Sequence, residues 1–167
     1  MLISSDTNVW IDFCLIDAIS LPFKLSHEFY ISEEALKDEL LMPAGINDNL
    51  LVLGLNSVPL ETEEYYYAVE MIKKYPRISK YDALALAIAK RRNYLLLTGD
   101  RALRKAAASE GIEVRGTIWI FDEMLAENVI DEKEYVLLLK KVLAHLGNEI
   151  RLPEKEIIYR INKYSDF

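Results

Sequence analysis

The sequence predicts an α/β protein: a three-layer α/β/α sandwich with a central parallel sheet, followed by a C-terminal helical extension. Short apolar runs alternate with helical patterns up to about residue 115, and this alternation is typical of βαβ units. From Thr117 onward only helical patterns remain. The chain has 167 residues, 51% of them hydrophobic, enough to bury a core without staples. We therefore expect a sheet domain at 1–125 and a helical extension at 126–167, packed on that domain or on a partner.

Start and stop signals divide the chain into elements. Ser32 and Ser79 stand where N-caps are expected, Pro76 ends a helical pattern, and Gly111 follows another. We expect strands at 2–5, 28–32, 94–98 and 112–115, with one more in either 50–55 or 58–60. We expect helices at 7–19, 33–42, 62–75, 79–92, 101–110, 119–128, 132–146 and 154–163.

The expected helix at 132–146 is apolar on more than one face. A surface helix normally keeps a polar side. This helix is therefore either sandwiched inside the fold or buried against a partner chain, and we favour the core.

Charge and cysteine content limit the classes of function. The formal net charge of −7 argues against a general nucleic-acid binder, but half of the basic residues fall between Lys73 and Lys105. This segment is either a set of solvated helix faces or a local phosphate-binding surface. The one cysteine, Cys14, cannot form an internal disulfide. We find no leader and no membrane-spanning stretch, so we expect a cytoplasmic protein with no membrane partner.

Three aspartates are predicted to meet at one edge of the sheet. Asp6 follows the first strand, Asp100 follows the strand at 94–98, and Asp82 lies in the first turn of the helix that precedes that strand. Carboxyl ends of parallel strands share an edge, which is where sites form in open α/β sheets. A crossover helix runs antiparallel to its strands, so its N-terminus lies at the same edge.

Helix capping is the simpler explanation for each aspartate taken alone. Asp6 and Asp100 precede expected helices, and Ser79 to Asp82 fits the Ser-x-x-Asp capping box. Their common edge favours a site instead, because clustered carboxylates repel one another unless a cation neutralises them. Mg²⁺ or Mn²⁺ suits such an all-oxygen setting, whereas zinc is disfavoured by one cysteine and two distant histidines, His27 and His145.

Three segments together resemble the signature blocks of PIN domains. They are Asp6-Thr7-Asn8 after the first strand, Tyr81-Asp82-Ala83-Leu84-Ala85-Leu86-Ala87, and Leu95-Leu96-Leu97-Thr98-Gly99-Asp100. The stretch from Gly111 to Thr117 is similar to the closing strand and glycine of that family. The resemblance covers roughly residues 1–125, and the helices after it look like an extension found in some PIN relatives.

The resemblance implies an Mg²⁺- or Mn²⁺-dependent endoribonuclease that cleaves single-stranded or structured RNA. It assigns catalysis to four acids, Asp6, Glu39, Asp82 and Asp100, and metal binding to the three aspartates among them. Glu34 and Asp38 compete with Glu39 for the helix carboxylate. Asn8 and Thr98 match the family's polar neighbours. Many members are toxins paired with an antitoxin protein, and homodimers are common.

Three basic residues near these acids are candidates to contact the RNA backbone: Lys80, Arg101 and Arg104. Ordinary surface charge explains them equally well.

Other functions remain open at this stage. The chain could be a non-catalytic RNA- or protein-binding module with the same fold, or a nuclease of RNA maturation rather than a toxin. A phosphatase of the haloacid-dehalogenase type also places an aspartate after its first strand. That family needs a second aspartate two residues later, where this chain has Asn8.

Overall fold

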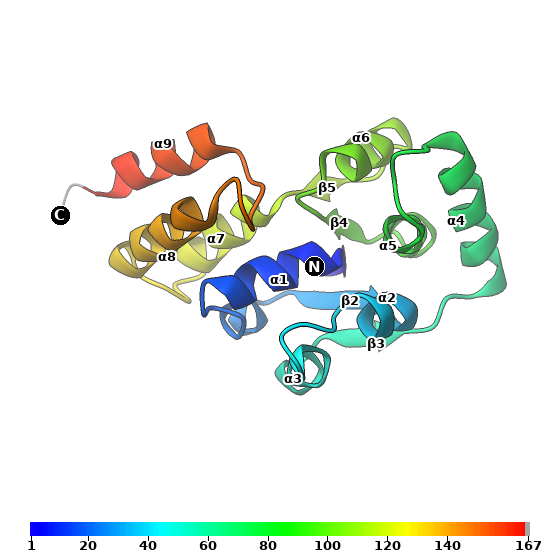
Figure 1. Ribbon diagram of the computed structural model, residues 1–167, viewed down its shortest axis with the longest axis horizontal. Coiled ribbons are helices and arrows are strands. Elements are labelled where there is room, and N and C mark those ends of the chain that lie inside the picture. Colours follow the sequence, from blue (N-terminus) through cyan, green and yellow to red (C-terminus); the bar gives the residue numbers. More distant parts are fainter. Residues whose placement is uncertain (166–167) are drawn as a thin grey trace.

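A computed structural model describes residues 1–165 and contains one five-stranded sheet in which every pairing is parallel. The strand order is β3-β2-β1-β4-β5, so β1 lies in the middle. The strands are β1 (Leu2–Ser5), β2 (Glu28–Ser32), β3 (Asn56–Val58), β4 (Leu95–Leu97) and β5 (Val114–Arg115). Helices cover both faces, which confirms the predicted α/β/α sandwich (Figure 1).

Helical segments connect the strands and then continue beyond the sheet. Those between strands are α1 (Thr7–Leu15), η1 (Leu21–Lys24), α2 (Glu33–Asp38), α3 (Ile46–Leu53), α4 (Thr62–Lys74), α5 (Lys80–Arg92) and α6 (Arg101–Ser109). The C-terminal ones are α7 (Thr117–Ala126), α8 (Glu132–His145) and α9 (Glu154–Tyr164). Figure 1 places α7, α8 and α9 at one end of the molecule and α4 at the other.

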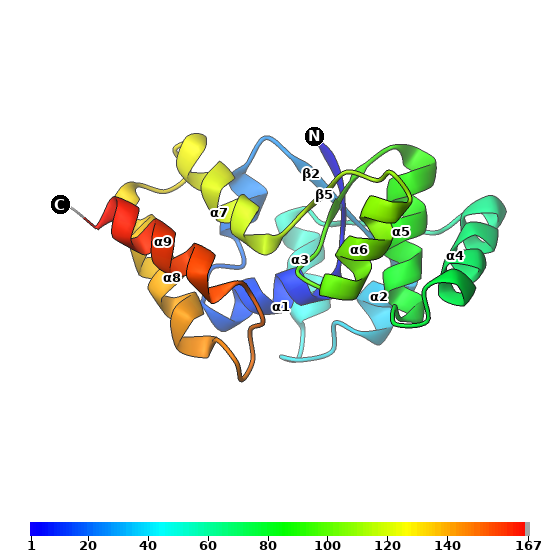
Figure 2. The same ribbon diagram turned by 90° about the horizontal axis from the view of Figure 1, so that it is seen from above.

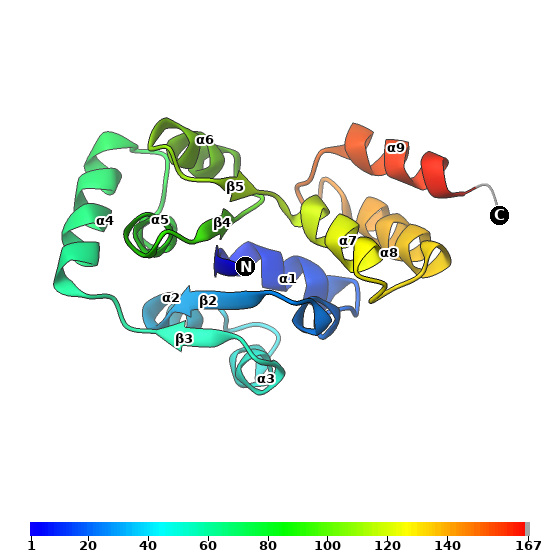
Figure 3. The same ribbon diagram turned by 180° about the vertical axis from the view of Figure 1, so that it is seen from behind.

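Alternation along the strands sends side chains into two separate cores. Leu95 and Leu97 of β4 join the cluster that contains residues of α1, α7, α8 and α9. Leu96, between them, joins the cluster formed with α4, α5 and α6. This period of two is what a sheet covered on both faces requires. The view from above separates the two groups of helices (Figure 2), and the reverse view shows the same division (Figure 3).

Two predicted helices are shorter than the sequence pattern indicated. The helix predicted at 7–19 ends at Leu15, because Asp17 adopts a positive φ of 57° that a helix does not tolerate. The helix predicted at 33–42 ends at Asp38, with Glu39 as its C-cap. Pro43 disfavours helical backbone at the residue before it, and Gly45 turns the chain with a φ of 83°.

The apolar run at 50–55 lies mostly in a helix rather than in a strand. Helix α3 begins after Gly45 and ends before Gly54, and both glycines have positive φ. Its apolar residues divide between a buried side, with Leu50, and an exposed side, with Val52. Of the two segments in which the third strand was expected, the later one is therefore correct, with the strand shifted to Asn56–Val58.

The C-terminal helices share a core with the sheet. Tyr135 and Leu139 of α8 are fully buried and belong to the same apolar cluster as Phe13 and Phe121. Arg160 of α9 donates to Asp122 of α7 at 2.8 Å. The division at residue 125 stays a prediction, and the last two residues of the predicted extension lie outside the described chain. Within residues 1–165, no helix combines the length and the apolar character needed to span a bilayer.

Replacing Leu139 by alanine tests whether α8 unfolds together with the sheet. Leu139 is fully buried, so Leu139→Ala should lower the free energy of unfolding by roughly 2–5 kcal/mol. Because the core is shared, thermal unfolding should remain one transition at a lower temperature. Leu137→Ala is the control, since Leu137 is 55% exposed on the same helix and should change stability by less than about 0.5 kcal/mol. Two separated transitions would instead show an independently folding extension.

A candidate acidic site at the carboxyl edge of the sheet

Asp6 lies at the carboxyl end of the central strand and is tied to the neighbouring strand. Its backbone N–H donates to the carbonyl of Leu97 at 3.0 Å. Thr98 Oγ1 donates to Asp6 Oδ2 at 2.8 Å and accepts from the backbone N–H of Asp100 at 3.0 Å. One threonine hydroxyl therefore links Asp6 and Asp100, two of the three aspartates that the sequence predicted at this edge.

Asp82 and Asp100 both cap helices, as the sequence predicted for each aspartate taken alone. Asp100 Oδ1 accepts from the backbone N–H of Leu103 at 2.8 Å. Asp82 Oδ2 accepts from the backbone N–H of Ser79 at 2.8 Å, and Ser79 Oγ accepts from the Asp82 N–H at 3.0 Å, which completes a capping box. Asp6 precedes α1 in the same way but makes no side-chain capping bond. Capping therefore accounts for the position of two of the aspartates and leaves Asp6 without that explanation.

Glu39 reaches the site through the residue that follows Asp6. Thr7 Oγ1 donates to Glu39 Oε1 at 3.2 Å and lies 3.4 Å from Asp6 Oδ1. Thr7 is 4% exposed, so its hydroxyl is fixed between the two carboxylates. Sequence reasoning did not assign Thr7 a role, because a threonine next to an aspartate gives no signal until the fold brings Glu39 beside it.

The two competing acids face other partners. Asp38 Oδ2 accepts from the Tyr81 hydroxyl at 2.9 Å. Glu34 forms an ion pair with Lys80 at 3.2 Å and accepts from the hydroxyl of Tyr65. Of the three candidates on and after α2, Glu39 is thus the one bonded beside Asp6.

Burial and the charges of neighbouring acids raise the pKa values of Asp6, Asp82 and Glu39. Burial is the main cause that raises the pKa of Asp6 from 3.8 to about 6; the charge on Asp82 adds to it, and the hydrogen bond from Thr98 opposes it. Burial also raises the pKa of Asp82, with a further contribution from the charge on Asp100. The pKa of Glu39 rises for the same first reason, and the charge on Asp82 contributes again. The four carboxylates therefore act on one another electrostatically.

Asp12 is a further acid that sequence reasoning missed. Burial and then the charge on Asp6 raise its pKa to about 7. It lies on α1, well after the end of β1, and no motif marks it. Helix α1 itself holds Asp12 within reach of Asp6, and the burial that chiefly raises its pKa depends on how α1 packs.

The donor set fits a hard divalent cation. Within the described part of the chain, no lysine or arginine forms an ion pair with Asp6, Glu39, Asp82 or Asp100. Oxygen-rich, uncompensated negative sites are the kind that Mg²⁺ and Mn²⁺ bind. The four acids do not form a group of oxygens all within 4.8 Å of one another among residues 1–165. Asp82 and Asp100 are each held instead by a helix-capping hydrogen bond.

One group of side chains does meet that distance, at the opposite edge of the sheet. His27 lies just before β2, and Glu123 and Glu127 lie on and directly after α7. Their polar atoms already have protein partners: His27 Nε2 contacts Glu123 at 3.0 Å, and Ser26 donates to Glu127 from both its backbone N–H and its hydroxyl. This network joins α7 to the start of β2, and it explains the burial of His27 without an ion.

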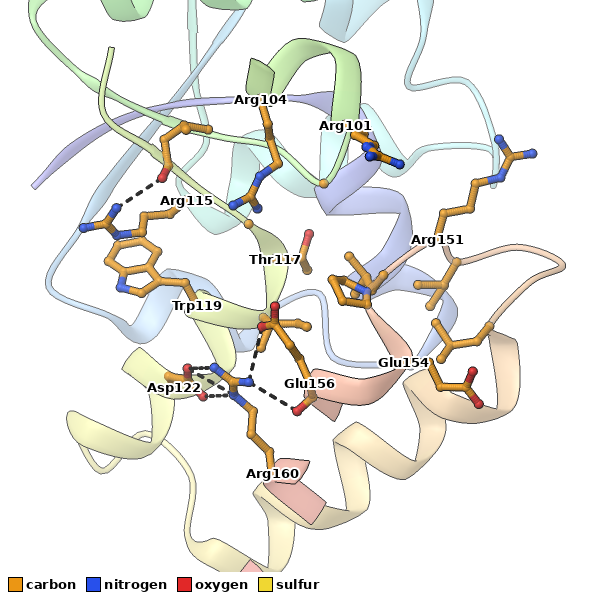
Figure 4. Close-up of a pocket in the computed structure, with 18 of the residues that line it drawn as sticks. Arg101, Arg104, Arg115, Thr117, Trp119, Asp122, Arg151, Glu154, Glu156 and Arg160 are labelled. Carbon is orange, nitrogen blue, oxygen red and sulfur yellow. Dashed lines mark hydrogen bonds and ion pairs between the residues drawn. The ribbon is translucent and has the colours of Figure 1, made fainter. Parts of the chain in front are cut away.

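The remaining predicted residues are distributed around this edge. Asn8 is exposed at the start of α1, and its side chain makes no hydrogen bond within residues 1–165. Lys80 is exposed and paired with Glu34. Arg101 and Arg104 on α6 line a hollow beside Gly99 (Figure 4). The structure therefore brings Arg101 and Arg104 toward one surface and leaves Asn8 and Lys80 apart from it.

The fold and this edge define a class: α/β/α sandwich proteins with an acidic cluster suited to divalent cations. A family model described as a PIN domain matches residues 2–161. The chain belongs to the PIN-domain family, whose members are generally nucleases that bind RNA and typically use divalent metals. This membership sets aside the haloacid-dehalogenase alternative. No curated protein and no solved structure shows a significant match to the chain.

The raised pKa of Asp6 predicts a pH-dependent stability. Its folded pKa of about 6 exceeds the ordinary value of 3.8, so the folded state holds the proton more tightly. The stabilisation is complete below about pH 4 and is lost as the pH rises through about 6. In EDTA near pH 7, Asp6→Asn should be more stable than wild type by on the order of 3 kcal/mol, and this gain should shrink toward about pH 4.

Thermal unfolding in EDTA and in Mn²⁺ measures this effect. Mn²⁺ should raise the unfolding temperature of the wild type and leave Asp6→Asn nearly unchanged. Asp17→Asn is the control, because Asp17 is exposed and asparagine also tolerates its positive φ. A wild type that is more stable than Asp6→Asn near pH 7 in EDTA would contradict the electrostatic account.

Proposed function

We propose that this protein is a divalent-metal-dependent endoribonuclease that cleaves single-stranded or structured RNA. The observation that carries the proposal is the Asp6 carboxylate, 5% exposed, with no cationic partner among residues 1–165 and no helix-capping bond. Burying such a charge destabilises the fold. A cost of this kind is typical of a functional site, where the missing partner is supplied from outside.

Three aspartates would hold the ion. Asp6 and Asp100 lie on either side of Thr98 and are the best candidates for direct ligands, and Asp82 completes the set from the start of α5. Mg²⁺ or Mn²⁺ is the ion that such oxygen donors select. When bound, an ion of this kind lowers the pKa of water and offsets charge on a phosphate.

The protein's own residues would orient the reaction. In hydrolysis a water oxygen forms a bond to phosphorus, the bond from phosphorus to the leaving oxygen breaks, and a proton passes to that oxygen. Thr98 holds one oxygen of Asp6 by a hydrogen bond, and the Thr7 hydroxyl lies beside the other while it donates to Glu39. Glu39, which accepts from the Thr7 hydroxyl beside Asp6, is the candidate to accept the proton of the attacking water.

Basic residues near this edge would meet the RNA backbone. Arg101 and Arg104 have no acidic partner within the described chain, so their charge is free to contact phosphate. Lys80 is weaker support, since it already pairs with Glu34 at the surface. Phosphate contacts from a few such residues give affinity without sequence preference.

The proposal extends to the cellular role of the nuclease. Following the family resemblance, we propose as one role the toxin of a toxin–antitoxin pair, a cytoplasmic homodimer whose antitoxin covers the acidic edge. If the protein is a nuclease, the alternative role is RNA maturation. If it is not an enzyme, it is a non-catalytic module that would bind RNA without turnover in Mg²⁺ or Mn²⁺.

Comparing Asp82→Asn with Ser79→Ala separates catalysis from capping. Purified wild type should cleave single-stranded RNA in Mg²⁺ or Mn²⁺, and EDTA should stop it. Asp82→Asn removes a proposed ligand and should lower the cleavage rate more than about 100-fold while the protein remains folded. Ser79→Ala removes the helix cap but keeps the carboxylate, so it should lower stability by about 1 kcal/mol and preserve cleavage. Asp82→Asn that loses stability but keeps cleavage would leave Asp82 with capping alone.

A second pair of variants tests the assignment of the helix carboxylate. Glu39→Gln removes the proposed base and should slow cleavage by roughly 10²–10⁴-fold. Asp38→Asn changes the adjacent acid, which faces Tyr81 instead, and should cleave within about twofold of wild type. Single-turnover cleavage of the same RNA measures both. Loss of activity in Asp38→Asn with a normal rate in Glu39→Gln would reverse the assignment.

A further inference from the structure

A basic hollow lies next to the acidic edge, and it includes Arg101 and Arg104, the two arginines proposed above to contact RNA. It has a volume of about 1100 Å³ and is bounded by α6, by the start of α7 and by the segment that joins α8 to α9 (Figure 4). Its lining includes six basic side chains: Arg101, Arg104, Lys105, Arg115, Arg151 and Arg160. The same lining includes the threonine that begins α7.

Thr117 carries a buried hydroxyl that lacks a partner. The residue is 1% exposed, and its Oγ1 makes no hydrogen bond within residues 1–165. Figure 4 shows Thr117 in the hollow, with its hydroxyl oxygen on the side where Arg101 and Arg104 lie. A buried hydroxyl without a hydrogen bond destabilises a fold, so it calls for an explanation. A ligand that accepts its hydrogen bond would provide one.

The backbone at this point is also suited to an anion. Helix α7 has ten residues and begins after Gly116, and no side chain caps its first turn. The first N–H groups of a helix have no intrahelical partner and carry partial positive charge. Such a terminus binds phosphate readily when nothing else occupies it.

Arg104 brings a full positive charge to the same place. Its guanidinium occupies the space that a Cβ at residue 116 would take, so the glycine allows Arg104 to lie against the start of α7. Arg101 and Arg151 also line the hollow, and like Arg104 they have no acidic partner among residues 1–165. Arg160 differs, since Asp122 and Glu156 neutralise it. Arg115 is also paired, with Glu113. Among residues 1–165, the basic side chains of the lining without an ion pair are therefore three on α6 and Arg151 between α8 and α9.

The hollow adjoins the predicted carboxylates through the sheet register. Ser5 pairs with Leu97, and Leu97 pairs with Arg115, so the residues directly after β1, β4 and β5 follow one another along the carboxyl edge. A Cβ placed on Gly99 would lie 3.6 Å from Thr117 Oγ1. Gly99 stands between Thr98, which bonds Asp6, and Asp100. The unpartnered hydroxyl is therefore one strand away from the acidic cluster.

We propose that Thr117, the first-turn N–H groups of α7 and Arg104 form a phosphate subsite for single-stranded RNA. The subsite holds a backbone phosphate beside the one that is cleaved. The choice of RNA as the ligand of this subsite rests on the proposed function, whereas the binding of phosphate does not depend on it. Its role is to fix the register of the strand against the acidic edge.

Binding without turnover tests the subsite. Two probes are titrated in EDTA, inorganic phosphate and a short single-stranded RNA, with backbone amide shifts for the first and fluorescence anisotropy for the second. Phosphate should shift the amides of Thr117 and Ile118. Thr117→Val should weaken RNA binding about tenfold, as loss of a hydrogen bond to a charged group does. Arg104→Gln should also weaken it and reduce the salt slope by about 0.7.

Matched variants control for folding and for general charge. Thr62 begins α4 as Thr117 begins α7, so Thr62→Val should leave RNA binding unchanged. Arg91, paired with Glu63 away from the hollow, gives the charge control Arg91→Gln. Thr117→Ser retains the hydroxyl and should keep wild-type affinity. Thr117→Val should be at least as stable as wild type, because it removes a buried group without a partner.

Each outcome decides one part of the proposal. Equal RNA affinity in Thr117→Val and wild type overturns the subsite, as do phosphate-induced shifts confined to other amides. If Thr117→Val does not fold, Arg104→Gln and the wild-type amide shifts decide instead. Phosphate shifts without RNA binding identify a site for free phosphate and contradict the RNA assignment. RNA cleavage in Mn²⁺ is measured separately, so an inactive protein that still binds through Thr117 retains the subsite while the proposed activity fails.

Discussion

The positions of Asp6 and Asp100 at the carboxyl edge of the sheet both depend on the hydroxyl of Thr98. It donates to Asp6 at the end of the central strand and accepts from the backbone of Asp100 at the start of α6. It is fully buried, so water cannot replace either bond. Because Thr98 bonds both residues, the spacing of β1 and β4 fixes the distance between Asp6 and Asp100. Strand β5 pairs with β4 in register, so the start of α7 follows next along the same edge.

Folding buries negative charges at this edge, and their burial opposes folding. Packing of α1 and α5 against the sheet brings Asp6 and Asp82 together, and burial then penalises their charges. The protein supplies hydroxyl and backbone donors but no cation within the described chain. Stability is therefore provided by the two apolar cores on either face of the sheet, which offset the strain of the edge.

Local sequence signals predicted most of the fold, and the exceptions have physical causes. Capping residues and glycines marked the limits of α5 and α6 well, because these signals act within a few residues. The early end of α1 depends on the positive φ of Asp17, and α2 ends at Asp38, before the turn at Pro43 and Gly45; apolar spacing reveals neither. For the site, strand ends located the aspartates, whereas the contact of Thr7 with Glu39 joins segments 32 residues apart, and the burial of Asp12 and Thr117 depends on how their helices pack.

Capping has a consequence for how inactive relatives could be recognised. Asp82 and Asp100 both hold helix termini, so a lineage that abandoned catalysis would still gain from keeping them, and their presence is a poor marker of activity. Asp6 makes no such bond, and drift would readily exchange it for a neutral side chain. The aspartate after the first strand is therefore the position at which an ancestral enzyme and a degenerate descendant would be told apart.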